Sequence, residues 1–445
     1  MRFSSYSTVL KLADKEGYVI VNTKNSSWGV ISKEPEITKF KNLLEQKIFD
    51  LNDDMVKSLY DKGYIVDDDK NEFQEIKEKI HTKLKNISKT FYALLYVTKQ
   101  CNFRCIYCPE DHISSNFSDE LWDALYLHIK NGLKNGTYKN AIVSFFGGEP
   151  LLETKKIIAF MEKLECLKKK YPHFDISYLM TSNGYLLKPN IYDKMSSYGL
   201  KNIQITVDGF ADIHNKMRPK VNGGETWDTI IKNLDYINSI EKGATITLRT
   251  NMNHLNKDEM LNFNNWVKDR YKNTKFNFDI NLVVDFSDNV NKEMIADETN
   301  PEINQIKAEL NAKNDKSNLY GMSEILSIMS MTCKSAQGSF YAITPDWRVA
   351  KCENIYKGED VYWGTLKKDG NIKRYDNMEK WNNSKEDDNC KECIVYPQCA
   401  AKMCPYRFAN HPESREFCCN MQKESFTQQL MVALEQQLGT KVVPI

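Results

Sequence analysis

The chain has 445 residues, of which 41% are hydrophobic and 27% are charged, and its 61 basic and 60 acidic side chains leave a net charge of +1. This composition excludes a disordered chain, and the balanced charge lacks the basic excess that is typical of proteins that bind nucleic acids or anionic membranes. No apolar run reaches the ~18 residues that cross a bilayer, and the N-terminus lacks the apolar core of a secretory signal. We therefore expect a cytoplasmic protein with no nucleic-acid partner and no membrane partner.

Residues 1–90 form the first predicted domain. Two β-branched and aromatic runs, Tyr18–Val21 and Trp28–Ile31, are separated by polar turn residues, and this pattern predicts a hairpin. Helical patterns follow at Ile37–Gln46 and Asp53–Lys62, and a short strand comes after them. This order of elements predicts a winged-helix-like α+β domain.

Residues 91–320 form the second predicted domain, in which strand-like apolar runs alternate with helical patterns. This alternation indicates an α/β domain whose parallel sheet curls into a partial (β/α)6 TIM-type barrel. Residues 285–317 are polar, and we expect them to form a bridge at the end of this domain. The six predicted strands are Phe91–Thr98, Ala141–Phe146, Ile176–Thr181, Asn202–Val207, Thr245–Thr250 and Phe278–Val284.

Residues 321–445 form the third predicted domain, which is rich in cysteine and predicted to be irregular. We expect metal sites, more than a large apolar core, to hold it together. The chain has 12 cysteines, and most of them are clustered. In a reducing compartment, clustered cysteines indicate metal ligands or redox chemistry more often than disulfides.

The first cysteine cluster has the spacing Cys101-x3-Cys105-x2-Cys108 and follows the first predicted strand of the barrel. Structural zinc usually takes four protein ligands, and only three cysteines lie here. Three thiolates on one tight loop can each bind one iron of a cubane cluster, which leaves the fourth iron open to a small molecule. A zinc site that is completed from elsewhere in the chain and a simple electron carrier remain alternatives.

This spacing resembles that of the radical S-adenosylmethionine (SAM) enzymes. The resemblance implies a [4Fe–4S] cluster on the three cysteines, with SAM chelating the open iron. It further implies that SAM is cleaved to a 5′-deoxyadenosyl radical, which takes a hydrogen atom from the substrate. A low-potential electron donor such as ferredoxin or flavodoxin is then an expected partner.

The resemblance extends to polar residues at the ends of the predicted strands. The run Gly147–Pro150 resembles the GGEP motif that receives the SAM ammonium group, and Ser182 and Asn183 resemble the family's polar contact to ribose or methionine. Tyr107 matches the aromatic that packs on adenine, and two arginines are candidates for the SAM carboxylate. No residue is assigned a catalytic role beyond the cofactors. The implied SAM-binding residues are Tyr107, Gly147, Gly148, Glu149, Ser182, Asn183, Asp208, Arg218 and Arg249.

The C-terminal cysteines suit two further cubane clusters, which need four ligands each. They resemble the SPASM extension of a subgroup of radical SAM enzymes, although Trp347 stands where the pattern has a glycine and the gap from Cys399 to Cys404 is one residue longer. The resemblance implies an outer auxiliary [4Fe–4S] cluster on Cys390, Cys393, Cys399 and Cys419, with Cys418 as the alternative last ligand. The implied inner cluster uses Cys333, Cys352 and Cys404, with either an open iron or Cys418 as the fourth ligand.

SPASM-bearing enzymes mostly modify peptides or proteins, and the N-terminal module weakly resembles the leader-binding domains of maturases that act on ribosomally made peptides. The expected function is therefore hydrogen abstraction from a precursor peptide, followed by a carbon–sulfur (thioether) or carbon–carbon crosslink. One alternative is a side-chain-oxidising maturase of the anaerobic sulfatase-maturase type. Another, of a different class, is a non-catalytic iron–sulfur electron carrier or a zinc-binding protein.

Overall fold

The computed structural model divides the chain into two compact units, one made of Met1–Ile87, Leu319–Gly338 and Glu379–Ile445, and the other of Ser88–Asn318 and Ser339–Met378. We call them the terminal unit and the central unit. The structure describes residues 1–272, 275–283, 291–296, 303, 306, 322–337, 339–355, 358–376, 386–402, 404 and 415–445. Most of the predicted bridge at residues 285–317 lies outside these residues.

The central unit contains a large, mainly parallel sheet, as the apolar runs of the sequence predict. The six predicted strands are confirmed, and each pairs in parallel with the next in chain order, for example Ala93 opposite Val143. They are β6 (Thr90–Thr98), β7 (Asn140–Gly147), β8 (Asp175–Ser182), β9 (Leu200–Thr206), β10 (Thr245–Met252) and β11 (Phe276–Leu282).

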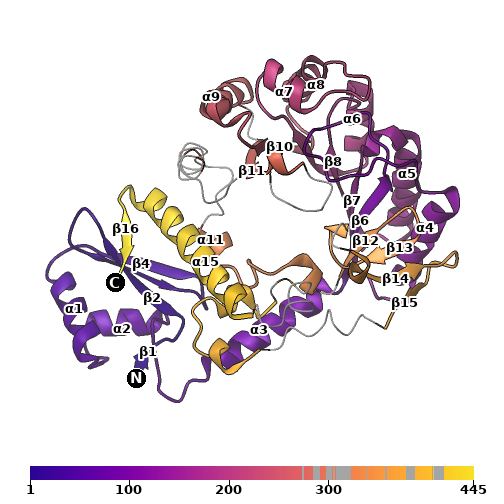
Figure 1. The fold of residues 1–445 in the computed structure, drawn as a ribbon. Helices are drawn as coiled ribbons and strands as arrows, with labels where there is room; N and C mark the ends of the chain where they lie inside the picture. The colour runs from indigo at the N-terminus through magenta and orange to yellow at the C-terminus, as the bar shows by residue number, and fades with distance from the viewer. Residues whose placement is uncertain are drawn as a thin grey trace. The chain divides into compact units, whose positions relative to one another are not determined.

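Helices connect these strands and pack on the sheet, as Figure 1 shows. Ser118 accepts a hydrogen bond from the backbone N–H of Leu121 and so caps the first of these helices. The core between sheet and helices is built from fully buried side chains such as Val143, Leu164 and Ile203. The helices are α4 (Asp119–Lys134), α5 (Thr154–Lys170), α6 (Pro189–Ser197), α7 (Ala211–Met217), α8 (Trp227–Ser239) and α9 (Met260–Arg270).

The sheet continues beyond β6 with four short strands, where the sequence led us to expect irregular structure. β12 pairs in parallel with β6, and the next three strands pair antiparallel in chain order. The expectation is wrong here because Phe340, Ala342 and Ile343 are buried and add to the core of the barrel. These strands are β12 (Phe340–Ile343), β13 (Arg348–Ala350), β14 (Tyr362–Leu366) and β15 (Ile372–Arg374).

The terminal unit contains a four-stranded antiparallel sheet. The predicted hairpin is confirmed, with Val21 opposite Trp28. The two predicted helices are confirmed as well, and Asp53 caps the second by accepting from the backbone N–H groups of Met55 and Val56. The elements are β1 (Arg2–Phe3), β2 (Ser7–Leu12), β3 (Tyr18–Asn22), β4 (Ser27–Ile31), α1 (Glu36–Gln46), α2 (Asp54–Asp61), β5 (Ile65–Val66) and α3 (Glu72–Ile87).

The C-terminal segment completes the sheet of the terminal unit, a pairing that the sequence did not predict. Strand β16 (Val442–Pro444) follows the long helix α15 (Arg415–Leu438), as Figure 1 shows. It pairs antiparallel with β2, so the sheet order is β16-β2-β3-β4. Phe426 and Leu430 of α15 pack with residues of β2 and β3 in one apolar cluster. Two short helices, α11 (Met322–Ile325) and α13 (Tyr396–Cys399), belong to the same unit.

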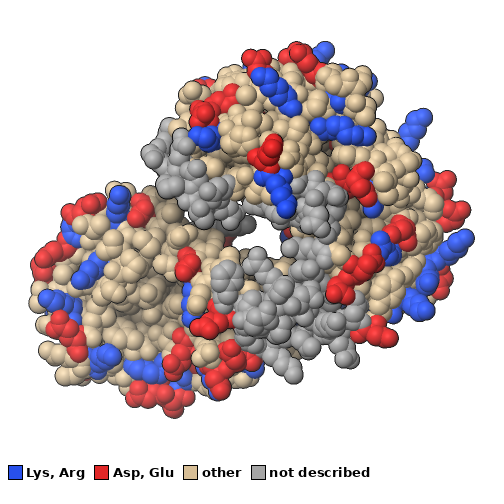
Figure 2. Space-filling model, in the orientation of Figure 1, with Lys and Arg blue, Asp and Glu red and all other residues tan. Residues whose placement is uncertain are grey.

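The surface carries both signs of charge. On the face drawn in Figure 2, the lysine and arginine side chains are interspersed with aspartate and glutamate, in keeping with the net charge of +1. Among the residues that the structure describes, no helix has the length and apolar character needed to cross a bilayer.

Candidate functional site

The loop that carries Cys101, Cys105 and Cys108 follows β6 at the carboxyl end of the sheet. Two backbone hydrogen bonds anchor it to the end of α7 and the residues that follow: Ile106 N donates to Met217 O at 3.0 Å, and Arg104 N donates to Pro219 O at 2.8 Å. No disulfide joins any cysteine of the chain. The loop is therefore held in place by backbone contacts, and its three thiols remain available as ligands.

Burial controls the charge state of these three thiols. It raises the pKa of Cys101 to about 12, and it raises the pKa of Cys105 and Cys108 as well. The negative charges of the neighbouring thiols act in the same direction. A buried group of thiolates needs positive charge beside it, and an iron–sulfur cluster supplies that charge. The donor set thus fits the cluster that the sequence predicts.

Asn183, a predicted SAM-binding residue, lies beside the first cysteine. Its Nδ2 is 3.9 Å from Cys101 Sγ and donates to Asn102 Oδ1 at 2.8 Å. The backbone N–H of Phe103 also points to Cys101 Sγ, at 3.4 Å. Sequence reasoning missed Asn102, because a polar residue between two motif positions carries no signal of its own.

Glu149 is fully buried, and the structure brings it together with Ser182 and Asn183. Its Oε1 accepts from Leu151 N and from Ser182 Oγ, both at 2.9 Å, and its Oε2 accepts from Asn183 N at 2.7 Å. Burial raises the pKa of Glu149, and these hydrogen bonds offset part of that rise. All three donors are neutral, so within the described residues the carboxylate makes no ion pair and is suited to a cationic ligand group.

Gly147 and Gly148 let the end of β7 lie directly against the start of the cysteine loop. A Cβ on Gly147, whose φ is +128°, would lie 2.1 Å from Thr98 O, and a Cβ on Gly148 would lie 2.2 Å from Gln100 O. The backbone N–H of Gly148 donates to Thr98 O at 2.9 Å, and that of Glu149 donates to Gln100 O at 2.8 Å. The structure therefore shows the two glycines making a close approach to protein backbone.

The Tyr107 hydroxyl connects the cysteine loop to the ends of β9 and β10. It hydrogen bonds to the Asp208 carboxylate and accepts from Arg218 Nη1 at 2.6 Å and from Asn251 Nδ2 at 3.0 Å. Asp208 Oδ1 in turn accepts from Asn251 N at 2.7 Å, and Asp208 Oδ2 lies 3.4 Å from Arg218 Nη1. Asn256, which sequence reasoning missed, donates to Asp208 O at 3.1 Å. Three predicted residues thus form one buried network.

Two polar atoms beside this network have no hydrogen-bond partner among the described residues: Arg218 Nε and His214 Nε2. His214 Nδ1 accepts from Asp208 N at 3.1 Å, so the hydrogen of the neutral ring is on Nε2. Burial, and to a smaller extent the charge of Arg218, lower the pKa of His214 and keep the ring neutral. Buried donors are normally satisfied, so a polar ligand with acceptor atoms fits this place.

Arg249 lies at the edge of the network. Its Nε donates to Asn251 Oδ1 at 3.2 Å, and its Nη1 forms an ion pair with Asp279 Oδ2 at 2.9 Å. Asp279 lies opposite Arg249 on the neighbouring strand β11. Sequence reasoning missed Asp279, although opposite charges on two neighbouring predicted strands could have indicated this ion pair. Arg249 therefore reaches the predicted site through Asn251.

In the terminal unit, the four predicted ligands of the outer auxiliary cluster lie near one another. Burial, together with the charges of Cys419, Cys393 and Cys390, raises the pKa of Cys399 to about 12. Cys418 is buried next to Cys419 on α15. The structure thus groups Cys390, Cys393 and Cys399 with Cys419.

The three predicted ligands of the inner cluster are divided between the two units. Cys333 and Cys404 belong to the terminal unit, where Cys333 N donates to Lys402 O at 3.2 Å, and Cys352 belongs to the central unit. In the part of the chain that the structure describes, no group of three or more His, Cys, Asp or Glu side chains is arranged around a single metal ion. The inner cluster stays a prediction.

Known proteins resemble the chain in sequence and in fold. The family model of the radical SAM superfamily matches residues 95–267. GTP 3′,8-cyclases of Campylobacter jejuni (strain RM1221) and Helicobacter pylori (strain HPAG1) are 27% identical over 200 residues and 31% identical over 185 residues. These matches cover 42% and 40% of this chain and 55% and 52% of the two relatives, so the chain spans about half the length of the curated relatives it matches.

Among solved structures, anSMEcpe with bound AdoMet has a TM-score of 0.56 and 18% identity, over 78% of this chain and 98% of that one. At this identity the likeness concerns the fold, and it agrees with a partial barrel in the central unit. A radical SAM domain implies SAM and a [4Fe–4S] cluster as cofactors, and the donor set of the cysteine loop fits both. Residues 95–267 therefore form a radical SAM domain.

Proposed function

We propose that this enzyme modifies a ribosomally made precursor peptide, taking a hydrogen atom from it and installing a carbon–sulfur or carbon–carbon crosslink. The observation that carries the proposal is the presence of two separate groups of cysteines in one chain. The Cys101–Cys108 loop adjoins Glu149 and the Tyr107 network, and a second cysteine group lies in the unit that contains the N-terminal module. An enzyme that only cleaves SAM needs no second group.

Cys101, Cys105 and Cys108 would hold the first cluster, and the buried polar residues around them would hold SAM. The bound cofactors supply a 5′-deoxyadenosyl radical that abstracts hydrogen. Glu149 is suited to the SAM ammonium group because its present donors are neutral, and Arg218 is suited to the carboxylate because one of its N–H groups is unpaired. Ser182 and Asn183 are fixed by Glu149 and orient the ligand.

Cys390, Cys393, Cys399 and Cys419 would hold the outer auxiliary cluster, and Cys333, Cys352 and Cys404 the inner one. The turn after β12 supports a SPASM-type arrangement. Trp347, which stands where that pattern has a glycine, has a φ of +70°, a conformation that favours glycine. The backbone thus keeps the shape that a glycine would give. The auxiliary clusters would accept the surplus electron of the reaction, and a ferredoxin or flavodoxin would deliver the first one.

The partner peptide would bind by strand addition to β4. Within the described residues this sheet has two edge strands, β16 and β4, and β4 is the longer of the two, with five residues against three. Exposed sheet edges bind extended peptides through their main-chain groups. The solved structure of anSMEcpe with a bound Cp18Cys peptide, which has a TM-score of 0.52, supports a peptide as the kind of substrate that this fold admits.

A second candidate is oxidation of a single side chain, as in an anaerobic sulfatase maturase. The fold likeness to anSMEcpe favours it, since that likeness covers 98% of the known chain. The match to anSMEcpe leaves part of this chain without a counterpart, because the match covers only 78% of this chain. The added N-terminal module favours the peptide-crosslinking enzyme.

The experiment is anaerobic incubation of the reconstituted enzyme with SAM, dithionite and a short precursor peptide encoded beside its gene. We expect 5′-deoxyadenosine and a peptide that has lost two hydrogen atoms per crosslink, with two residues joined in the fragment spectrum. The Cys105→Ala variant is expected to make neither product. Cys166→Ala, which changes an exposed cysteine on α5, is the matched control and should behave like the wild type. A product altered at one residue only would favour the second candidate.

A further inference from the structure

The N-terminal module touches the C-terminal cysteine segment, defined here as residues 390–399, through main-chain groups. The Tyr6 hydroxyl donates to Lys391 O at 2.7 Å. Thr23 Oγ1 donates to Ile394 O at 2.7 Å, and Gln398 Nε2 donates to Thr23 O at 2.9 Å. These contacts join parts of the terminal unit that lie almost a whole chain apart in the sequence.

The contacted carbonyl groups lie next to cluster ligands. Lys391 follows Cys390, and Ile394 follows Cys393, so Tyr6 and Thr23 each restrain the backbone just after one predicted ligand. Tyr6 is fully buried, and Cys390 and Cys393 pack against the apolar cluster to which it belongs. A side chain in this place acts on the cysteines through the backbone that carries them.

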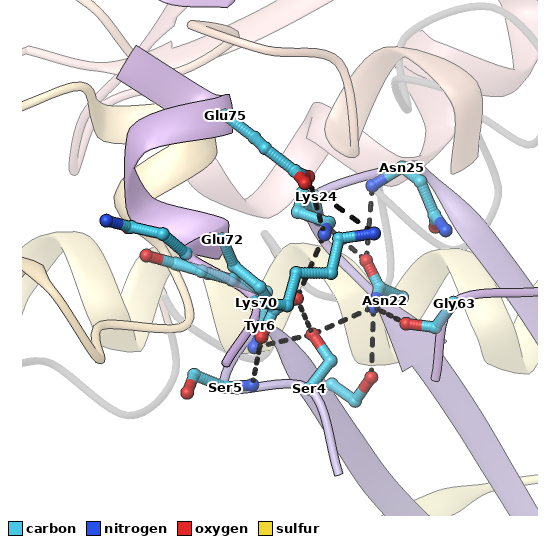
Figure 3. A network of polar contacts seen from close by, with 12 residues as sticks. Ser4, Ser5, Tyr6, Asn22, Lys24, Asn25, Gly63, Lys70, Glu72 and Glu75 are labelled. Atoms are coloured by element: carbon cyan, nitrogen blue, oxygen red, sulfur yellow. Dashed lines mark hydrogen bonds and ion pairs between the residues drawn. The ribbon is translucent and has the colours of Figure 1, made fainter. Parts of the chain in front are cut away.

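Tyr6 and the turn between β3 and β4, residues 22–26, are themselves fixed by a buried network (Figure 3). Asn22 Oδ1 accepts from Lys24 N at 3.0 Å and from Asn25 N at 3.1 Å, which closes the turn. Asn22 Nδ2 donates to Ser4 Oγ at 3.2 Å, and that oxygen also accepts from Tyr6 N at 3.2 Å. The two contact points are therefore parts of one rigid arrangement.

Glu72, at the start of α3, anchors this arrangement by charge. Its carboxylate accepts from Ser4 Oγ at 2.7 Å and lies 3.0 Å from Lys24 Nζ and 2.9 Å from Arg2 Nη1. The Glu72 and Lys24 side chains are 2% and 7% exposed, so the pair is shielded from solvent and from salt. The network thus fixes the positions of Tyr6 and the turn.

We propose that Tyr6 and Thr23 are positioning residues for the outer auxiliary cluster, so that the N-terminal module helps to build an iron–sulfur site at the other end of the chain. This inference rests on the proposed function, which assigns the cluster to Cys390, Cys393, Cys399 and Cys419. Groups that orient metal ligands raise metal affinity, because the ligands lose less freedom on binding. The two hydrogen bonds hold the cysteine segment in shape before the cluster is present.

The test is the rate at which a ferrous chelator removes iron from the full-length, anaerobically reconstituted enzyme. In the Tyr6→Phe/Thr23→Val variant, which deletes both hydroxyl groups with little change of shape, we expect the outer-cluster iron to be released roughly 10-fold faster. SAM cleavage by the first cluster should stay at the wild-type rate. Tyr60→Phe is the matched control, because that hydroxyl donates to Asp67 on the surface of the same module, at 2.8 Å.

The Cys390→Ala/Cys393→Ala background identifies the iron that is being measured. In that background the iron released from the outer cluster should be absent. Adding Tyr6→Phe/Thr23→Val should then leave the rate of iron release unchanged. If the Tyr6→Phe/Thr23→Val variant of the otherwise unaltered chain releases iron at the wild-type rate, the inference is overturned. If iron loss from the first cluster, on Cys101, Cys105 and Cys108, is accelerated as much as iron loss from the outer cluster, and the melting temperature is lower, the inference is also overturned, since the effect is then general. If the wild type holds no cluster on Cys390 and Cys393, the proposed function fails, and that outcome is distinct from the others.

Discussion

At the scale of single residues, Tyr107 makes more polar contacts within the site than the sequence predicts. The resemblance predicts that its ring packs on adenine, and this stays a prediction. What the structure adds is the role of the hydroxyl, which contacts Asp208, Arg218 and Asn251 at once. The orientation of Arg218 toward a ligand carboxylate therefore depends on one oxygen atom of the cysteine loop.

Tyr107→Phe is expected to weaken SAM binding by about 10-fold, because a buried hydrogen bond to a charged group contributes about 1.5 kcal/mol or more. The measurement is calorimetric titration of the reconstituted enzyme with SAM. Tyr236→Phe, which removes an exposed hydroxyl bound to Asp193 at 2.7 Å in the same unit, should leave the affinity unchanged. Equal affinities for Tyr107→Phe and the wild type would show that Arg218 is held without the hydroxyl or does not bind SAM.

At the scale of secondary-structure elements, the attachment of α3 to the N-terminal sheet depends on a buried charge. Burial raises the pKa of Glu72, but Ser4, Lys24 and Arg2 together outweigh it and hold the pKa below its ordinary 4.5. A carboxyl group whose pKa is depressed by folding stabilises the fold above its unfolded pKa, and this contribution is lost as the pH falls through the folded value. The terminal unit should therefore lose stability below about pH 4.5.

Glu72→Gln is expected to destabilise the protein at pH 7 by about 3 kcal/mol, because the buried Lys24 charge then keeps only the more exposed carboxylate of Glu75, at 3.1 Å. It should also flatten the pH dependence of stability on the acid side. Denaturant unfolding, followed by far-UV circular dichroism from pH 3 to 7, measures both effects. Glu78→Gln on the exposed face of the same helix should change stability by no more than about 0.5 kcal/mol. A variant that unfolds like the wild type at every pH would disprove the role assigned to Glu72.

At the scale of the whole molecule, the barrel strands could be predicted because each is an apolar run of seven to nine residues and helical patterns lie between them. β12 to β15 and β16 could not, because three to five residues give little periodicity and their partners are distant in the sequence. Large separation in the sequence also limited the prediction of contacts within the site. Motif positions such as Glu149 and Asn183 were predicted from the motif pattern, whereas Asn102 was not, since only the fold brings it to its partner Asn183.

The sequence also did not predict that the N-terminal module and the C-terminal cysteines belong to one compact unit. Three segments of the chain form the terminal unit, and its side-chain hydrogen bonds cross between segments, as at Tyr6 and Thr23. Hydrogen bonds to backbone carbonyl groups leave no trace in composition or spacing. The predicted division into residues 1–90, 91–320 and 321–445 stays a prediction about how the chain is organised for function.

The central claim is that the three thiols of the Cys101–Cys108 loop hold an iron–sulfur cluster whose open iron binds SAM. Electron paramagnetic resonance of the dithionite-reduced enzyme, recorded with and without SAM, tests it most directly. We predict that SAM shifts the g-values of one cluster signal, and that this signal is missing in the Cys101→Ala/Cys105→Ala/Cys108→Ala variant while the remaining signals persist. A spectrum that SAM does not change, or a SAM-sensitive signal that survives in the triple variant, would contradict the claim.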